Sequence, residues 1–391
     1  MQVARTKARP FHLGGMLRAF LQDSRSVGIV LLTCTAISMF IANSAAGRSW
    51  LRLINKRQQL PSWLHVPHTP LHWINDGAMA LFFFLVGMEI KRELLSGELS
   101  DARKAALPVA AAVGGMLVPA LLYLAFNHDS GHVSGWAIPM ATDIAFSLGV
   151  ASLLGPRVPV SLKIFLMALA IIDDLGAILV IALFYGGELH TGWLLGAVGV
   201  AAVLALLHVL KKHNTIVFII LCIALWYMVY NSGVHATIAG VAAAFFVPLH
   251  KLEKYEHALK HLVNFAVLPL FALANTAILL PADMAAPFTT PLSWGILAGL
   301  VLGKPIGIVL FCGLMVKLRL GKRPSGSSWW QITGVGILAG IGFTMSIFIT
   351  LLAFPGGEYR NIAKLAILAA SLLSIIGGFV LLRLSPPAKH V

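Results

Sequence analysis

The chain has 391 residues, of which 58% are hydrophobic and only 11% are charged, and its mean hydropathy is +0.86. Soluble globular domains carry about 25% charged residues because their surfaces face water, so this composition excludes an ordinary soluble protein. The net charge of +14 would suit a nucleic-acid-binding protein, but the basic residues lie in short loops between apolar segments. Because nucleic-acid sites need clustered basic residues, we expect no nucleic-acid partner.

Apolar stretches dominate the chain from about residue 26 to residue 384, and a membrane-spanning helix needs roughly 20 mostly apolar residues. We therefore predict an all-α polytopic membrane protein, with about twelve transmembrane helices in a single domain, 26–384. Residues 1–25 are basic and lack the apolar core of a cleavable signal peptide, so we expect a cytoplasmic tail there and a second one at 385–391. In chain order, the predicted spans are centred on 28–43, 75–88, 108–126, 139–153, 162–184, 193–209, 217–230, 234–247, 259–278, 294–316, 333–353 and 362–382.

The Lys and Arg residues indicate the orientation of the chain. If the N-terminus is cytoplasmic, 22 of the 29 fall on the cytoplasmic side, six fall outside and Lys304 lies within a span. This is the cytoplasmic excess that membrane proteins show, so we predict that both termini are cytoplasmic. The outer loop at 45–69 holds four of the six external basic residues. This loop is either a solvated linker or a small ordered element that supports a homodimer.

The three cysteines, Cys34, Cys222 and Cys312, lie far apart inside apolar segments. This spacing supports neither a disulfide framework nor a zinc site. We expect no cofactor.

Four ionisable residues fall near the middle of predicted spans: Asp143, Asp173, Asp174 and Lys304. Each costs about 2.5–3.5 kcal/mol at the centre of a membrane helix if it faces lipid. These side chains must therefore point inward, toward one another or toward water. A purely architectural ion pair would account for one aspartate and Lys304, but not for all three carboxylates.

Asp173 and Asp174 are adjacent within a long apolar segment. Neighbouring side chains on a helix point about 100° apart, so one carboxylate can face a partner while the other faces a cavity. Carboxylate oxygens can hold a proton or a small hard cation. The pair therefore indicates a site that holds either a proton or a small hard cation.

Two predicted spans carry features that interrupt a helix. Residues 135–146 contain Pro139 and the Thr142-Asp143 pair, and residues 334–346 are rich in glycine. Glycine would also permit close helix packing. However, these are about the fourth and eleventh spans, the central members of two inverted three-helix repeats at about 103–185 and 291–383. We therefore predict discontinuous helices crossing at the bilayer midplane, with Asp143 and Lys304 balancing the charges of the half-helix ends.

Four motifs resemble the NhaA sodium/proton antiporters, in which paired interrupted helices are an established feature. They are Ala-Thr-Asp143-Ile-Ala-Phe, Leu-Ala-Ile-Ile-Asp173-Asp174-Leu-Gly-Ala, Gly-Lys304-Pro-Ile-Gly and Gly-Ile-Gly-Phe-Thr-Met-Ser-Ile-Phe. The resemblance runs from about Trp73 to Leu382. It implies a multi-pass protein of the bacterial inner membrane that exports cytoplasmic Na⁺ or Li⁺ electrogenically, in exchange for a larger number of H⁺ and under control of cytoplasmic pH.

The resemblance also implies roles for individual residues. Asp174 resembles the principal cation and proton site, with Asp173 beside it as the partner of Lys304 and Thr142 lining the site. For His235, a packing role is an equal alternative to pH sensing. The candidate pH-sensing residues are Glu89, Glu93, Glu256, His257, Asp76 and His235.

Two rival functions are compatible with buried aspartates. An intramembrane aspartyl protease is an enzyme that needs two converging aspartates, whereas neighbours on one helix diverge, so we expect a secondary active transporter and not an enzyme. A sodium-coupled organic-anion transporter of the same inverted-repeat class is the alternative, because Lys304 could meet an anion.

Overall fold

The computed structural model describes residues 24–212 and 214–385, so nearly all of the tail predicted at 1–25, and residues 386–391 of the tail predicted at 385–391, lie outside the described residues. Within these two ranges the chain forms helices and connecting turns and no β-strand. The all-α fold is therefore confirmed.

Short 3₁₀ and π turns, labelled η, alternate with the α-helices. The first half contains α2 (Ser24–Ala42), α3 (Gly47–Ile54), η1 (Ser62–Leu64), α4 (Pro70–His72), η2 (Trp73–Ala78), α5 (Met79–Ser96), η3 (Glu98–Ser100), α6 (Ala102–Asn127), η4 (Val133–Met140), α7 (Ile144–Leu153), η5 (Gly155–Arg157) and α8 (Val160–Phe184). The second half contains α9 (Thr191–Val209), α10 (Thr215–Asn231), α11 (Ala236–Phe245), α12 (Leu249–Leu262), η6 (Val263–Val267), α13 (Leu268–Asn275), η7 (Ala286–Thr289), α14 (Pro291–Leu297), η8 (Ala298–Gly303), α15 (Lys304–Lys317), α16 (Trp329–Ala339), α17 (Phe343–Ala353) and α18 (Glu358–Leu384).

The number of apolar helices agrees with a polytopic protein. In the described ranges, eight helical segments are long and apolar enough to cross a membrane. Two bent pairs, α2 with α3 and α16 with α17, also qualify, and α10 and α11 are shorter apolar helices. Together these segments correspond one to one with the twelve predicted spans.

The structure differs from the sequence prediction mainly at polar segments. The ninth span begins at Leu249, ten residues before the predicted start, because the polar α12 runs through η6 into α13 as one helical segment. Of the two alternatives for the loop at 45–69, the structure agrees with an ordered element, since the loop contains α3 and η1, while its part in a homodimer remains a prediction. Apolar periodicity does not reveal a helix whose first half is polar.

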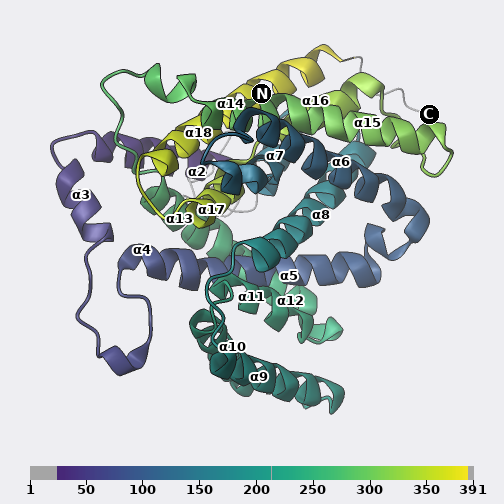
Figure 1. The fold of residues 1–391 in the computed structure, drawn as a ribbon. Coiled ribbons are helices and arrows are strands. Elements are labelled where there is room, and N and C mark those ends of the chain that lie inside the picture. The colour runs from purple at the N-terminus through teal and green to yellow at the C-terminus, as the bar shows by residue number, and fades with distance from the viewer. Residues whose placement is uncertain (1–23, 213, 386–391) are drawn as a thin grey trace, which may run out of the picture.

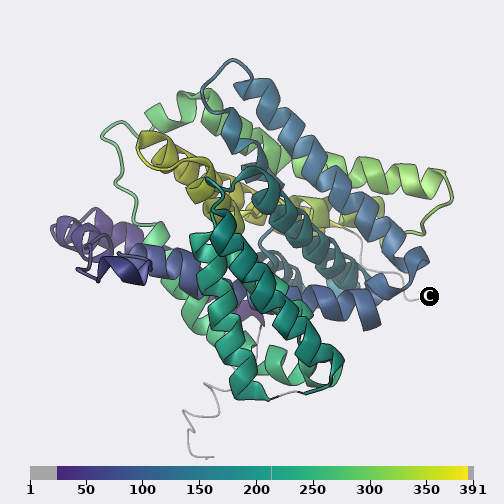
Figure 2. The same cartoon turned by 60° about the horizontal axis from the view of Figure 1, so that its bottom comes forward.

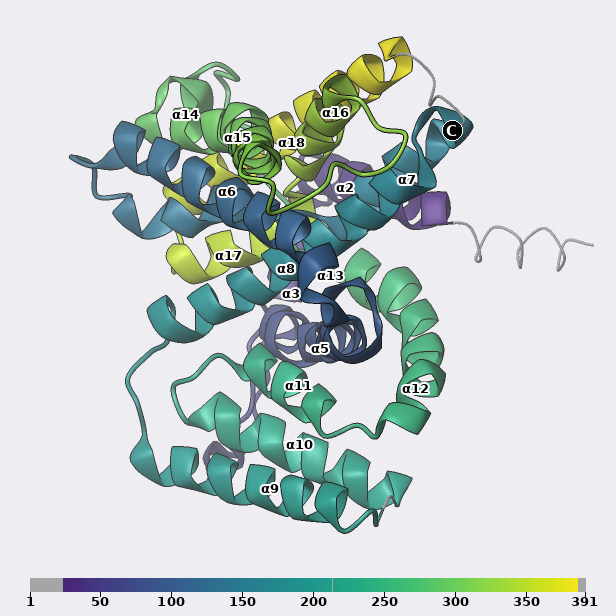
Figure 3. The same cartoon turned by 90° about the vertical axis from the view of Figure 1, so that its right-hand side faces the viewer.

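The helices form two groups that share α5. Figure 3 shows α9, α10 and α11 at the lower end of the molecule and α6 with α14–α18 at the upper end. The smaller group has its own apolar core, made by Ala197, Leu204, Leu225, Val229, Ala239 and Ala243. Helices α9 and α10, teal in Figures 1 and 2, pack side by side.

The two broken helices lie within the larger group and cross at their breaks. Half-helix η4 packs against α17, and α7 packs against α16. At the crossing, Asp143 N donates to Ile341 O at 2.6 Å, and Ser346 Oγ donates to Ile138 O at 2.8 Å. The two breaks therefore satisfy each other's backbone groups, as an apolar environment requires. The repeats at about 103–185 and 291–383 remain a prediction.

Candidate functional site

The first break lies at Ala141–Asp143, between η4 and α7. Pro139 has no N–H to continue a helical ladder, and Asp143 caps α7 by accepting a hydrogen bond from Phe146 N at 3.2 Å. The second break lies at 340–342, between α16 and α17. A side chain at Gly340 would place its Cβ 2.2 Å from the carbonyl oxygen of Leu300, so only glycine permits this approach.

Asp143 joins the N-terminal ends of two half-helices. Its Oδ1 accepts from the first turn of α7, and its Oδ2 accepts from Thr344 N at 3.2 Å and from the Thr344 hydroxyl, in the first turn of α17. Helix N-termini carry partial positive charge, which a carboxylate balances. Sequence reasoning assigned this balancing position to Asp143 but did not identify Thr344 as its partner.

Lys304, from the start of α15, lies fully buried against Asp173 of α8. Its Nζ donates to Asp173 Oδ2 at 2.6 Å and also to the Thr142 hydroxyl. Thr142 Oγ1 lies 2.7 Å from Asp173 Oδ2 and 2.9 Å from the Ala339 carbonyl oxygen at the end of α16. Since Thr142 has one hydroxyl proton, it can donate to only one of these acceptors at a time. The structure thus brings Asp173, Lys304 and Thr142 into one hydrogen-bonded cluster.

Asp174 points away from this cluster. It lines a cavity of about 350 Å³ together with Thr142, Asp143 and Thr344, whereas Asp173 and Lys304 do not line it. The Asp174 side chain is only 2% exposed, and its Oδ1 has no hydrogen-bond partner among the described residues. Two neighbouring aspartates therefore differ in kind: one is paired, and the other is an unpaired buried carboxylate facing a cavity.

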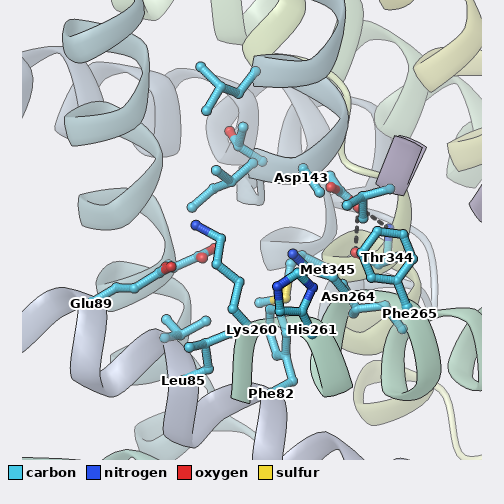
Figure 4. A pocket seen from close by; sticks show the side chains of 18 of the residues that line it. Phe82, Leu85, Glu89, Asp143, Lys260, His261, Asn264, Phe265, Thr344 and Met345 are labelled. Carbon is cyan, nitrogen blue, oxygen red and sulfur yellow. Dashed lines mark hydrogen bonds between the residues drawn. The ribbon is translucent and has the colours of Figure 1, made fainter. Parts of the chain in front are cut away.

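The other end of the cavity is lined by charged and polar side chains from α5 and from the α12–η6 segment. Figure 4 shows Glu89 on one side, with Lys260, His261 and Asn264 reaching in from the opposite helix. His257 also lines this cavity. Lys260, His261 and Asn264 were not predicted as site residues. They follow His257 by three, four and seven residues, so all four side chains lie on one face of the helix. This spacing is the feature of the sequence from which they could have been predicted.

Glu93 and Glu256 do not line the cavity. Both are buried and share Arg92, whose Nη1 lies 2.6 Å from Glu256 Oε1 and whose Nη2 lies 3.3 Å from Glu93 Oε1. Glu93 Oε2 also accepts from Glu98 N at 3.1 Å. These residues therefore form a buried ionic bridge between α5 and α12.

Asp76 and His235 form a separate pair that does not line the cavity. His235 Nδ1 lies 3.9 Å from Asp76 Oδ1, and the His235 ring packs against Phe348 with a centroid distance of 5.8 Å. Asp76 lies within the π turn η2. The structure does not bring these two residues to Asp174.

The chain matches the sequence model of the Na⁺/H⁺ antiporter 1 family over residues 18–382. It belongs to this family. It is 49% identical to the Na⁺/H⁺ antiporter NhaA 2 of Flavobacterium johnsoniae over 371 residues, covering 93% of this chain and 91% of the relative. It is 50% identical to Na⁺/H⁺ antiporter NhaA of Escherichia coli over 378 residues, covering 94% and 97%, and of Salmonella typhimurium over 385 residues, covering 95% and 99%. The NhaA-type resemblance is thus confirmed, and the chain is a multi-pass bacterial membrane protein.

The buried pair predicts the stability of Lys304 variants. Lys304→Ala leaves Asp173 as an orphan buried charge, which typically costs about 3–5 kcal/mol, so the variant should unfold at a clearly lower temperature in detergent. The double variant Asp173→Asn/Lys304→Ala should recover part of that loss. Lys317→Ala, an exposed lysine at the end of the same helix, is the control and should leave the unfolding temperature unchanged. A double variant no more stable than Lys304→Ala would contradict the orphan-charge explanation.

Proposed function

We propose that this protein is a secondary active Na⁺/H⁺ antiporter of the inner membrane, which exports cytoplasmic Na⁺ or Li⁺ in exchange for a larger number of protons. The single observation that carries the proposal is the unpaired buried carboxylate of Asp174 at the cavity. Such a group is stabilised by whatever neutralises it, and a proton and a small hard cation are alternatives. The family membership and the names of the relatives support the same reaction.

The cavity residues suggest how Na⁺ binds. The carboxylate of Asp174 would supply the main ligand, and the hydroxyl of Thr142 lines the same cavity. Asp173 would join only by loosening its bond to Lys304, since its Oδ2 is already shared with Lys304 and Thr142. Na⁺ would then take over part of the neutralisation that Lys304 provides.

This arrangement accounts for electrogenic exchange. With protons bound, Asp174 is neutral and Asp173 is balanced by Lys304. With Na⁺ bound, Asp174 is ionised, and the Asp173–Lys304 pair releases a second proton as Na⁺ replaces the lysine charge beside Asp173. Two protons then exchange for one Na⁺, so each cycle moves one net positive charge inward, and the membrane potential drives export.

The rival functions fit the geometry less well. An organic-anion transporter needs a cation at the site, but Lys304 is sealed behind the cavity against Asp173, while Asp143, Asp174 and Glu89 line the cavity. An aspartyl protease needs two converging carboxylates, whereas Asp173 and Asp174 point into different surroundings. Lys260 also lines the cavity, but the three carboxylates there outnumber this one lysine, so the lining favours a cation over an organic anion.

Regulation and assembly are further parts of the proposal. The Arg92 bridge to Glu93 and Glu256, together with Glu89 and His257 at the cavity, provides titratable groups for control by cytoplasmic pH. Asp76 and His235 remain separate candidates. Both termini are proposed to be cytoplasmic, and a homodimer through the 45–69 loop remains a prediction.

Replacing Asp174 with Asn tests the site directly. The amide keeps the shape of the side chain but can neither ionise nor release a proton, so Na⁺- and Li⁺-driven proton movement in everted vesicles should fall to background at saturating sodium. Asp129→Asn, which changes an aspartate whose side chain is 89% exposed, is the matched control and should exchange normally. Substantial exchange by a correctly inserted Asp174→Asn protein would refute the assignment.

Competition between Na⁺ and H⁺ predicts the pH dependence. Because the proposed exchange displaces protons when Na⁺ binds, acidification should raise the apparent KM for Na⁺ by up to about tenfold per pH unit for each displaced proton, and thus by up to about a hundredfold where both protons are displaced. High sodium should restore most of the rate at acid pH. Initial rates measured across two pH units at several sodium concentrations check this, and a constant apparent KM would exclude a shared site.

Lys260 predicts an electrostatic effect on sodium affinity. It lines the same cavity as Glu89 and places a positive charge opposite that carboxylate (Figure 4). Removing this cation with Lys260→Gln should lower the apparent KM for Na⁺ about two- to fivefold at low ionic strength, with less effect in high salt. Lys260→Arg should behave like the unmodified protein. Lys254→Gln is the matched control, an exposed lysine on the same helix outside the cavity. An equal effect from the control would mean that general surface charge, and not the cavity, sets the affinity.

A further inference from the structure

Two histidine side chains stand one helical turn apart on α12. His257 and His261 are four residues apart, so they lie on the same face of the helix. Both are exposed, and both line the cavity that Asp174 lines. Figure 4 shows His261 beside Lys260 in the wall of this cavity. Neither imidazole is a ligand for Na⁺ in the proposed exchange, because hard cations prefer oxygen ligands.

The distance between the two rings suits a shared metal ion. The ring centroids of His257 and His261 are 5.7 Å apart. Two imidazoles bound to one tetrahedral ion through bonds of about 2.0–2.1 Å have their centroids about 5.2 Å apart. The observed spacing exceeds this value by only about 0.5 Å, which a small side-chain rotation provides. Zinc enzymes use histidine pairs with this helical spacing as metal ligands.

The pair supplies only part of a coordination sphere. Among the described residues, no group of three or more His, Cys, Asp or Glu side chains could hold a metal ion, so water would fill the other positions. Half of a four-ligand zinc site provides about half of its binding free energy, which corresponds to a Kd on the order of 1–100 µM. Ala258 stands where zinc proteases with this spacing carry their catalytic glutamate, so the pair supports binding and not hydrolysis.

We infer that His257 and His261 chelate a transition-metal dication, such as Zn²⁺, Cu²⁺ or Ni²⁺, in the cavity. Imidazole suits these ions, whereas Mg²⁺ and Ca²⁺ prefer oxygen ligands. The bound ion adds two positive charges to the cavity that Na⁺ must enter, so it repels Na⁺ from Asp174 and inhibits exchange. This inhibition rests on the proposed function, but the chelation does not.

Contacts between the rings hold them close to the chelating separation. The His257 ring meets the His261 ring edge-on at an interplanar angle of 75°, and His261 stacks on Phe265 with a centroid distance of 6.3 Å. Side chains that are already positioned lose less conformational freedom when they bind a ligand. A purely packing role for the pair makes the opposite forecast, because it requires no affinity for metal.

Metal binding to the full-length protein, purified in detergent without an affinity tag, tests the chelate. With equimolar Cu²⁺, electron paramagnetic resonance should show hyperfine splitting from two nitrogen ligands. His257→Gln and His261→Gln should each remove this signal and weaken Zn²⁺ binding, measured by calorimetry, by at least about tenfold. His250→Gln is the matched control, an exposed histidine on the same helix that does not line the cavity, and it should bind like the unmodified protein.

A shifted pair separates the spacing from the number of histidines. His261→Gln/Leu262→His keeps two histidines on α12 but places them five residues apart, which turns them about 140° from one another. Leu262 is 48% exposed, so the substitution does not disturb the core. This variant should bind Zn²⁺ as weakly as His261→Gln.

Exchange is measured in proteoliposomes with Zn²⁺ on both sides of the membrane. Zn²⁺ should inhibit Na⁺-driven proton movement at concentrations near its measured Kd, and EDTA should reverse the inhibition. Relative to its own metal-free rate, each single variant should need at least about tenfold more Zn²⁺. Mg²⁺ at the same concentration should not inhibit, since it carries the same charge but does not favour imidazole.

The possible failures are distinguishable. Equal Zn²⁺ binding by the unmodified protein and His261→Gln, or full-strength binding by the shifted pair, would overturn the chelate. Binding without inhibition, or equal inhibition by Mg²⁺, would overturn the effect on Na⁺ entry. A protein that chelates Zn²⁺ but moves no protons on addition of Na⁺ in metal-free buffer would refute the proposed function and confirm the metal site.

Discussion

The ion pair between Asp173 and Lys304 is the interaction on which the rest of the site depends. Both groups are fully buried, and such a pair is tolerated only when its geometry is good and its remaining hydrogen bonds are made. Thr142 supplies one of those bonds from the break in the first broken helix, and its hydroxyl also reaches Ala339 at the end of α16. The pair therefore fixes α8, α15 and both broken helices relative to one another. Because Asp174 follows Asp173 on α8, the pair also fixes the position of Asp174.

The contrast between the two aspartates follows from this constraint. Asp173 Oδ2 is held by Lys304 and Thr142, although its Oδ1 has no hydrogen-bond partner among the described residues. Asp174, one residue later on the same helix, has been turned by about 100° into the cavity, where no described residue bonds its Oδ1. An unpaired carboxylate would be a defect in a structural core, but it is what a site needs if its occupant must bind and leave in every cycle. Asp143 differs from Asp174, since both of its carboxylate oxygens accept hydrogen bonds from the N-terminal turns of two helices and from the Thr344 hydroxyl.

The sequence predicted those features whose residue types are energetically unfavourable in an ordinary membrane helix. Charges inside apolar segments, Pro139 before Thr142-Asp143 and the glycines at 340 and 342 each required an unusual local structure, and the structure contains one at each place. The sequence did not predict contacts made by residues that several different environments accommodate at little cost in free energy. Lys260 could equally have faced water, Thr344 could have bonded its own helix, and Arg92 carried no sign that it bridges Glu93 and Glu256. The length of α12 was missed because its polar first half has no apolar period.

Both signs of charge line the cavity. Lys260, His257 and His261 line it together with Glu89, and Asp174, Asp143 and Thr142 line the same cavity. A cation in the cavity therefore meets carboxylates and hydroxyls as well as a lysine. Helix α12 carries Lys260 and His257, and its neighbour Glu256 is tied to α5 through Arg92. The Arg92 bridge that holds α12 against α5 therefore also fixes the position of Lys260 relative to Glu89. The contact between α5 and α12 thus affects the electrostatic potential in the cavity.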